Sequence, residues 1–124
     1  MANPSKVVLI VEDNEDNSIL AEKILNYYGF QTVVAPDGNA ALRYCDAHQP
    51  DLILMDLSLP DIDGIEVARL LRQKQRYHNL PIIALTAHMM PGIQEVTRKT
   101  GINDFLTKPF LPTDLIGIVK KYLH

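Results

Sequence analysis

Cysteine, clustered basic residues and long apolar runs are all scarce in this sequence. Cys45 is the single cysteine, which excludes an intrachain disulfide and a metal site built on several thiolates. No apolar run approaches the roughly 20 residues that a membrane-spanning helix requires, and residues 1–5 lack the apolar core of a signal peptide. These absences predict a cytoplasmic protein.

The charge of the chain argues against binding to nucleic acids or to anionic membranes. The formal net charge is −3, and the lysine and arginine residues are scattered along the sequence. Both kinds of partner require clustered positive charge, and a helix-turn-helix protein would need a basic recognition helix. We therefore expect neither a nucleic acid nor a membrane as a direct partner.

The length of the chain, 124 residues, predicts one domain, because a single core usually serves roughly 100–200 residues. An apolar fraction of 47% and a charged fraction of 22% are typical of a globular protein. No linker, repeat or low-complexity segment interrupts the sequence, which ends directly after its last predicted helix. We therefore expect residues 1–124 to form one domain without an output domain.

Three short apolar segments, residues 7–11, 52–55 and 82–85, predict the buried strands of a parallel sheet. Each is rich in valine, isoleucine or leucine, shows no polar alternation, and is too short for a buried helix. Such segments are typical of strands covered on both faces. The weaker segments 32–35 and 104–107 predict two further strands, nearer the edges of the sheet.

Helical periodicity follows each predicted strand. The weakest of these patterns lies at residues 91–100, where only Ile93 and Val96 are apolar, so we expect a loosely held fourth helix. Strand and helix thus alternate five times, which predicts an α/β fold of three layers with right-handed crossovers. The residues expected to face the core in the other helices are Leu20, Ile24 and Tyr28; Ala41, Cys45 and His48; Gly64, Val67, Ala68 and Leu71; and Leu115, Ile118, Val119 and Tyr122.

Acidic residues directly follow two of the predicted strands. Glu12 and Asp13 come after residues 7–11, and Asp56 comes after residues 52–55. The carboxyl ends of parallel strands meet at one edge of a doubly wound sheet, so these three carboxylates are expected to converge. Carboxylates held so close need a compensating cation, and a set of oxygen ligands suits Mg²⁺. The simpler alternative is that they only cap the following helices.

Two further polar residues are expected at the same edge. Thr86 brings a hydroxyl to the end of the fourth strand, and Lys108 brings an ammonium group to the end of the fifth. A carboxylate, a cation site, an ammonium and a hydroxyl are the parts that phosphoryl transfer needs, because that reaction depends on positioning and charge neutralisation. Asp56 is then the predicted nucleophile, which would form an acyl phosphate.

The loop after Asp56 is rich in turn-forming and acidic residues. Pro60 restrains it, and Gly64 is expected to permit the backbone conformation needed at the start of the third helix. Asp61 and Asp63 suggest a calcium-binding loop. That reading fails because leucines occupy its first and last ligand positions, which excludes an EF-hand.

Four segments together resemble the receiver domains of two-component response regulators, the CheY-like family. They read VLIVEDN at residues 8–14, LILMDLSLP at 52–60, ALTA at 84–87 and TKPF at 107–110. The resemblance extends over essentially the whole chain. It implies a flavodoxin-like (βα)5 fold with a parallel five-stranded sheet of order 2-1-3-4-5.

The resemblance also implies the partners of the acidic site. Asp56 would accept a phosphoryl group from a histidine kinase or a histidine phosphotransfer protein. Lys108 would contact that phosphoryl group, and the peptide bond between Lys108 and Pro109 would be cis. The implied Mg²⁺ ligands are Glu12, Asp13, Asp56 and the backbone carbonyl of Ser58.

A switch is the third implication of the resemblance. Thr86 would move toward the phosphoryl group, and Phe105 would rotate inward to fill the vacated space. Many receivers have a tyrosine where this chain has Phe105, and phenylalanine lacks the tyrosine hydroxyl. Ser58 and His88 flank the phosphoryl site and would set the phosphoryl lifetime. A downstream protein would read the surface formed by the fourth helix, the fifth strand and the fifth helix.

Several alternatives stay open at this stage. Within the family, the chain could be the receiver of a hybrid histidine kinase or a phosphate sink. An FMN-binding electron carrier would need a phosphate loop rich in hydroxyls and glycine, whereas residues 12–16 read EDNED. An aspartyl-phosphate hydrolase would need a second acid where Ser58 stands, so slow autodephosphorylation is the only catalysis expected. We expect a monomer, with dimerisation on phosphorylation as the alternative.

Overall fold

The computed structural model describes residues 6–87 and 92–123, in which five strands form one parallel sheet. The order of the strands is β2-β1-β3-β4-β5, so the predicted fold class and sheet order are confirmed. In chain order the elements are β1 (Val7–Val11), α1 (Glu15–Tyr27), β2 (Gln31–Ala35), α2 (Gly38–Ala47), β3 (Leu52–Asp56), α3 (Gly64–Arg72), the 3-10 helix η1 (Gln75–Tyr77), β4 (Ile82–Thr86), α4 (Ile93–Thr100), β5 (Asp104–Thr107) and α5 (Pro112–Tyr122).

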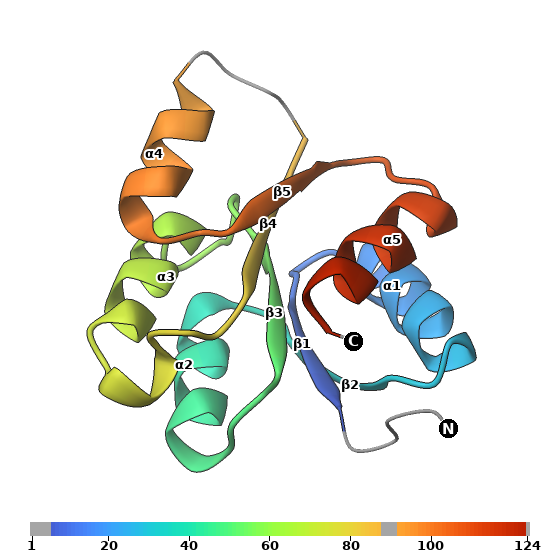
Figure 1. Ribbon diagram of the computed structural model, residues 1–124, viewed down its shortest axis with the longest axis horizontal. Helices are drawn as coiled ribbons and strands as arrows, with labels where there is room; N and C mark the ends of the chain where they lie inside the picture. Colours follow the sequence, from blue (N-terminus) through green and yellow to red (C-terminus); the bar gives the residue numbers. More distant parts are fainter. Residues whose placement is uncertain (1–5, 88–91, 124) are drawn as a thin grey trace.

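Helices cover the sheet on both of its faces, with α2, α3 and α4 on one side and α1 and α5 on the other (Figure 1). Alternate residues of a strand point to opposite faces. Leu9 and Val11 of β1 therefore pack with α2 and α3, whereas Val8 and Ile10 pack with α1 and α5. β3 and β4 are buried along their whole length. Burial on two faces is the reason that these strands are apolar without alternation.

The core-facing residues predicted for the first helix are wrong at two positions. Leu20 is 44% exposed, and Tyr28 is 42% exposed and lies just beyond the end of α1. The buried side of α1 is formed instead by Ala21, Leu25 and their neighbours Ser18 and Ile24. Ser18, Ala21 and Leu25 have the i, i+3, i+7 spacing of a buried helix stripe, one position away from the predicted stripe.

The second helix also ends earlier than its pattern predicted. His48 is the residue after α2, and its exposed ring stacks on Tyr44 with 4.7 Å between the ring centroids. Ala41 and Cys45 are buried as predicted. In α5, Leu115 and Val119 are buried, whereas the predicted core residues Ile118 and Tyr122 are only half-buried.

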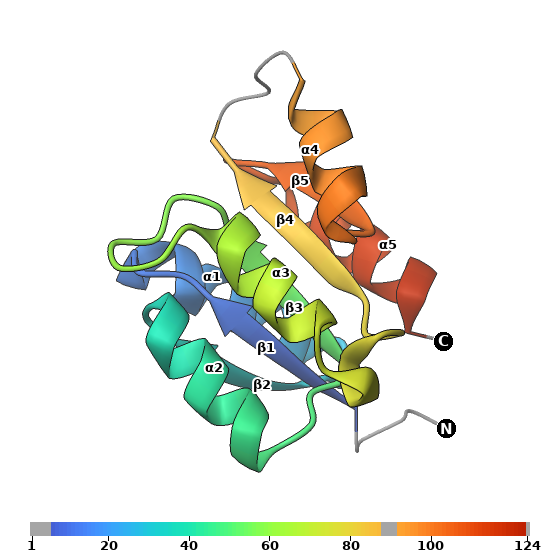
Figure 2. The ribbon, with the colours of Figure 1, turned by 90° about the vertical axis from the view of Figure 1, so that its left-hand side faces the viewer.

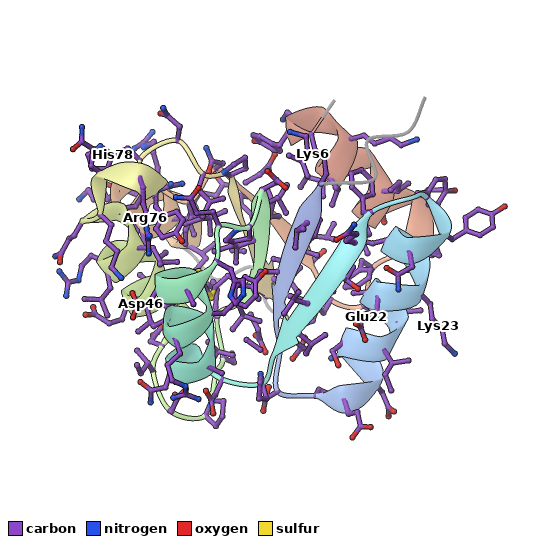
Figure 3. All side chains as sticks on the ribbon, turned by 90° about the horizontal axis from the view of Figure 1, so that it is seen from below. Lys6, Glu22, Lys23, Asp46, Arg76 and His78 are labelled. Carbon is purple, nitrogen blue, oxygen red and sulfur yellow. The ribbon has the colours of Figure 1, made fainter. Side chains whose placement is uncertain are left out.

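Tyr77, for which the sequence pattern predicted no role, is one of the largest fully buried side chains. Its hydroxyl donates to the carbonyl oxygens of Cys45 and, at 2.8 Å, His48. Nη2 of Arg76 donates to the same Cys45 carbonyl at 2.5 Å. These bonds join η1 to the end of α2 at the amino-terminal edge of the sheet, where Figure 3 shows Arg76 and Asp46 on neighbouring elements.

The side chain of Arg72 attaches the carboxyl end of α4 to the end of α3. Its Nε and Nη2 donate to the carbonyl oxygen of Gly101 at 3.0 and 2.7 Å, and Nη2 also donates to Oδ1 of Asn103 at 2.9 Å. Thr97 is the one buried residue of α4, and Val96 is exposed. Because Thr97 is the only buried residue of α4, the hydrogen bonds of Arg72 add to an attachment with little buried apolar surface. Figure 2 shows α4 beyond α3 in the ribbon.

Replacing Arg72 by alanine is therefore expected to destabilise the protein by about 2 kcal/mol, since it leaves carbonyl groups without their charged donor. The free energy of unfolding, measured in urea, checks this. Arg69 on the same helix forms an exposed ion pair with Glu66, so Arg69→Ala is a matched control with an expected loss below about 1 kcal/mol. Equal losses of unfolding free energy in the two variants would contradict a stabilising role for the hydrogen bonds of Arg72.

No helix among residues 6–87 and 92–123 is long and apolar enough to cross a bilayer.

Candidate functional site

The carboxyl ends of β1 and β3 bring three carboxylates together. Val11 and Met55 are paired in these neighbouring strands, and Glu12 and Asp56 are the next residues along the chain. Glu12, Asp13 and Asp56 each offer one oxygen, and the three oxygens lie within 4.8 Å of one another. Glu12 and Asp56 are only 3% and 2% exposed, whereas Asp13 is exposed. The sequence predicted this convergence from the strand ends alone.

Lys108 enters the same site from the end of β5. Its backbone N–H donates to the carbonyl of Thr86 at 2.8 Å, which fixes the chain beside the end of β4. The peptide bond to Pro109 is cis, as the family resemblance implied. Nζ of Lys108 lies 3.1 Å from Oε1 of Glu12 and 3.4 Å from Oδ2 of Asp56. The ammonium group thus touches both buried carboxylates.

The site carries more negative than positive charge, with three carboxyl groups around one ammonium. Burial and the neighbouring Asp56 raise the pKa of Glu12 from 4.5 to about 7, although Lys108 acts in the opposite direction. The Lys108 ammonium therefore offsets only part of the effect of burying these carboxyl groups side by side. Three oxygen ligands and excess negative charge fit a hard divalent cation such as Mg²⁺.

The loop after β3 is held close to the acidic site at its base. The N–H of Ser58 donates to Oδ1 of Asp56 at 2.9 Å, so the exposed Ser58 lies beside that carboxylate. A Cβ atom at Gly64 would lie 2.3 Å from the carbonyl oxygen of Asp56 and 3.0 Å from Cα of Leu57. Gly64 was expected to permit the backbone conformation at the start of α3, but its φ is not positive, so that conformation does not itself require glycine. Glycine is required there by space.

The residues expected to move lie near the site on β4 and β5. Thr86 ends β4, where only 9% of its surface is exposed. Phe105 is paired with Ala84 and half-buried, and it packs against the side of the core that contains α2 and α3. His88, the second residue expected to set the phosphoryl lifetime, lies outside the described residues.

The chain belongs to the family of response regulator receiver domains, which matches residues 8–120. It is 38% identical over 119 residues to the polar-differentiation response regulator DivK of Brucella ovis, an alignment that covers 96% of this chain and 97% of that protein. The family predicted from the four sequence segments is therefore confirmed, and the chain is a receiver of the two-component signalling type. This membership disfavours the FMN-binding alternative.

Solved structures resemble the chain over nearly all of its length. Chemotaxis protein CheY4 of Vibrio cholerae superposes with a TM-score of 0.91 at 27% identity, covering 95% of this chain and 98% of that one. The receiver domain of the sensor histidine kinase PA1611 of Pseudomonas aeruginosa superposes with a TM-score of 0.87 at 36% identity, covering 94% and 96%. That structure has a magnesium ion coordinated in its active-site cleft.

Proposed function

We propose that the chain is a phosphoacceptor switch in which Asp56 takes a phosphoryl group from a histidine kinase or a histidine phosphotransfer protein. The observation that carries the proposal is the environment of Asp56, a buried carboxylate with the Lys108 ammonium 3.4 Å away and two further carboxylates beside it. An oxygen of Asp56 would attack phosphorus, and the bond from phosphorus to the donor histidine nitrogen would break. That nitrogen would keep the electron pair.

Mg²⁺ is the cofactor that fits the site, and it would neutralise charge on the transferred group and on the carboxylates. The magnesium ion in the PA1611 receiver supports this choice. Glu12, Asp13 and Asp56 offer the carboxylate oxygens, and the backbone carbonyl of Ser58 would complete the protein ligands. Lys108, which now contacts Glu12 and Asp56, would turn toward the phosphoryl oxygens as a point charge.

The output of the switch would be a changed surface. Thr86 would move toward the phosphoryl group, and Phe105 would fill the space that it leaves. The surface formed by α4, β5 and α5 would change with them and be read by a downstream protein. The slight burial of α4 supports this, because moving elements are drawn from weakly held parts of a structure.

Catalysis by the chain itself would be limited to slow autodephosphorylation. Ser58 lies two residues after Asp56, where a second acid would be needed for rapid hydrolysis. Ser58 and His88 would instead tune how long the phosphoryl group persists. We expect the protein to work in the cytoplasm as a monomer, with dimerisation on phosphorylation as the alternative.

Incubation with acetyl phosphate and Mg²⁺, followed by intact mass measurement, tests the proposal. The wild type is expected to gain one phosphoryl group that is labile in base, and Asp56→Asn is expected to gain none, because an amide oxygen is a poor nucleophile. Chelation of Mg²⁺ with EDTA should also prevent the gain. Equal labelling of wild type and variant, or no labelling of either, would refute the assignment of Asp56.

A relay or phosphate-sink receiver is the second candidate, favoured by the 36% identity to a receiver domain from a sensor histidine kinase. The chemistry at Asp56 would be the same, but the phosphoryl group would return to a histidine of a phosphotransfer protein. Transfer from the phosphorylated chain to such a protein within seconds would support the relay. Loss of phosphate only to water would support the stand-alone switch.

A further inference from the structure

The carboxylate of Asp61 binds the start of a helix that is distant from it in the sequence. Its Oδ1 accepts from the backbone N–H of Gly38 and its Oδ2 from that of Asn39, each at 2.9 Å. These are the first two residues of α2, whose N–H groups have no partner within the helix. Asp61 also accepts from its own neighbour, the N–H of Ile62, at 2.7 Å.

The pKa of Asp61 agrees with this arrangement. Loss of water contacts alone would raise it, but the hydrogen bonds from Asn39, Gly38 and Ile62 lower it below the usual aspartate value. The carboxylate is therefore bound as an anion by backbone donors from two segments.

Helix α2 does not need Asp61 simply to begin. Asp37, the residue before the helix, already accepts from the N–H of Ala40 at 2.8 Å, as an ordinary N-cap does. What Asp61 adds is a link between two segments, the loop from β3 to α3 and the helix α2 (Figure 2). The packing at Gly38 agrees, since a Cβ there would lie 3.1 Å from Cβ of Ile62 and 3.4 Å from Oδ1 of Asp61.

The same loop carries Ser58, whose backbone carbonyl is a ligand of the cation in the proposed function. Its first residue, Leu57, donates its N–H to the carbonyl of Leu85 at 3.1 Å, and Ser58 donates to Oδ1 of Asp56. The loop is thus fixed at its base by the sheet and at its far side by Asp61. Between the two fixed points lies Ser58, whose carbonyl oxygen is the backbone ligand that the proposed function assigns to the cation.

We propose that Asp61 is a positioning residue of the cation site, which fixes the loop that carries Ser58 and so keeps the Ser58 carbonyl in place as a ligand of the cation. The inference rests on the proposed function, because it requires the site formed by Glu12, Asp13 and Asp56 to bind Mg²⁺. Asp61 is not one of the three carboxylates that converge at the site. It acts through the backbone that it fixes against α2.

The test compares Mg²⁺ affinity in Asp61→Ala and Asp37→Ala. Both variants remove one negative charge and one cap from the start of α2, but only the first releases the loop. Mg²⁺ dissociation constants are measured by calorimetry and by amide NMR shifts, which need no phosphorylation. Asp61→Ala should weaken Mg²⁺ binding roughly tenfold, and Asp37→Ala by less than about twofold. Asp61→Asn, which keeps one acceptor oxygen, should lie between.

A second measurement distinguishes a weakened cation site from a general loss of structure. With acetyl phosphate, the Mg²⁺ concentration for half-maximal phosphorylation should rise in Asp61→Ala, while the rate at saturating Mg²⁺ stays within about twofold of wild type. The melting temperature should fall in both alanine variants, and further in Asp61→Ala, which loses the bonds to Gly38 and Asn39 where Asp37→Ala loses only the bond to Ala40.

The inference is overturned if Asp61→Ala binds Mg²⁺ as tightly as wild type, or if Asp37→Ala is weakened equally. Failure of the proposed function looks different, since the wild type itself would then show neither Mg²⁺ binding at Asp56 nor phosphorylation.

Discussion

Replacing Gly64 by alanine is expected to destabilise the protein by about 3 kcal/mol, near the upper end of the cost of overpacking. The added Cβ would lie 2.3 Å from the carbonyl oxygen of Asp56 and 3.0 Å from Cα of Leu57. Both atoms belong to the backbone, so no side-chain rotation relieves the contact. Either α3 moves outward or the end of β3 is displaced, and the second outcome moves Asp56 itself.

Urea denaturation gives the measurement, and Gly117→Ala is the matched control. Gly117 lies within α5, and a Cβ there would meet nothing within 4 Å. Alanine is favoured over glycine inside a helix, so this variant is expected to be more stable than wild type by roughly 0.5–1 kcal/mol. The close packing of α3 on the end of β3 would be disproved by a Gly64→Ala protein as stable as wild type.

The metal-free protein is expected to lose about 3 kcal/mol of stability as the pH rises from about 5 to about 8. Glu12 is the cause, because its pKa is raised from 4.5 to about 7 by burial and by Asp56. Between these two values the folded state keeps a proton that the unfolded state has released, so a higher pH favours unfolding. Above the pKa of Glu12 in the folded state, both states have released the proton, so the contribution of Glu12 to stability no longer changes with pH. Asp13, Asp56 and Lys108 are the charged groups that face Glu12.

Unfolding in urea with EDTA, at a series of pH values, measures this dependence. Glu12→Gln is the control, because it removes the titrating group while contributions from other groups cancel in the difference between the two proteins. If Glu12 is a ligand, Mg²⁺ must displace its proton, and the affinity for Mg²⁺ should rise about tenfold per pH unit below 7. Equal pH profiles for wild type and Glu12→Gln would contradict the raised pKa.

Short apolar segments that predict strands alternate with segments of helical periodicity, and this alternation was sufficient to predict the fold class. Strands buried on both faces have a sequence pattern of their own, and β1, β3 and β4 follow it. The helices were harder to orient. Leu20 and Tyr28 have the spacing of a core stripe, but Ala21 and Leu25, which have the same spacing, are the residues that face the sheet. Spacing alone does not distinguish these two stripes, and the packing of the helix decides between them.

The candidate site was predictable to the extent that it depends on strand ends. Glu12, Asp13 and Asp56 follow parallel strands, and parallel strands end at one edge, so their proximity follows from the fold. The role of Asp61 could not be found in this way. Its partners Gly38 and Asn39 are more than 20 residues away, and no local pattern predicts hydrogen bonds between a loop and a helix so distant in the sequence.

The sequence by itself determined the order of the elements, the family and the set of residues at the acidic edge, because each depends on local pattern or on the direction of a strand. The tertiary structure alone decided that Glu12 is buried enough to hold its proton near neutral pH, that Gly64 faces a backbone carbonyl, and that Asp61 joins two segments. These properties depend on distances between groups that are remote in the chain, and such distances exist only after the sheet and its helices have packed.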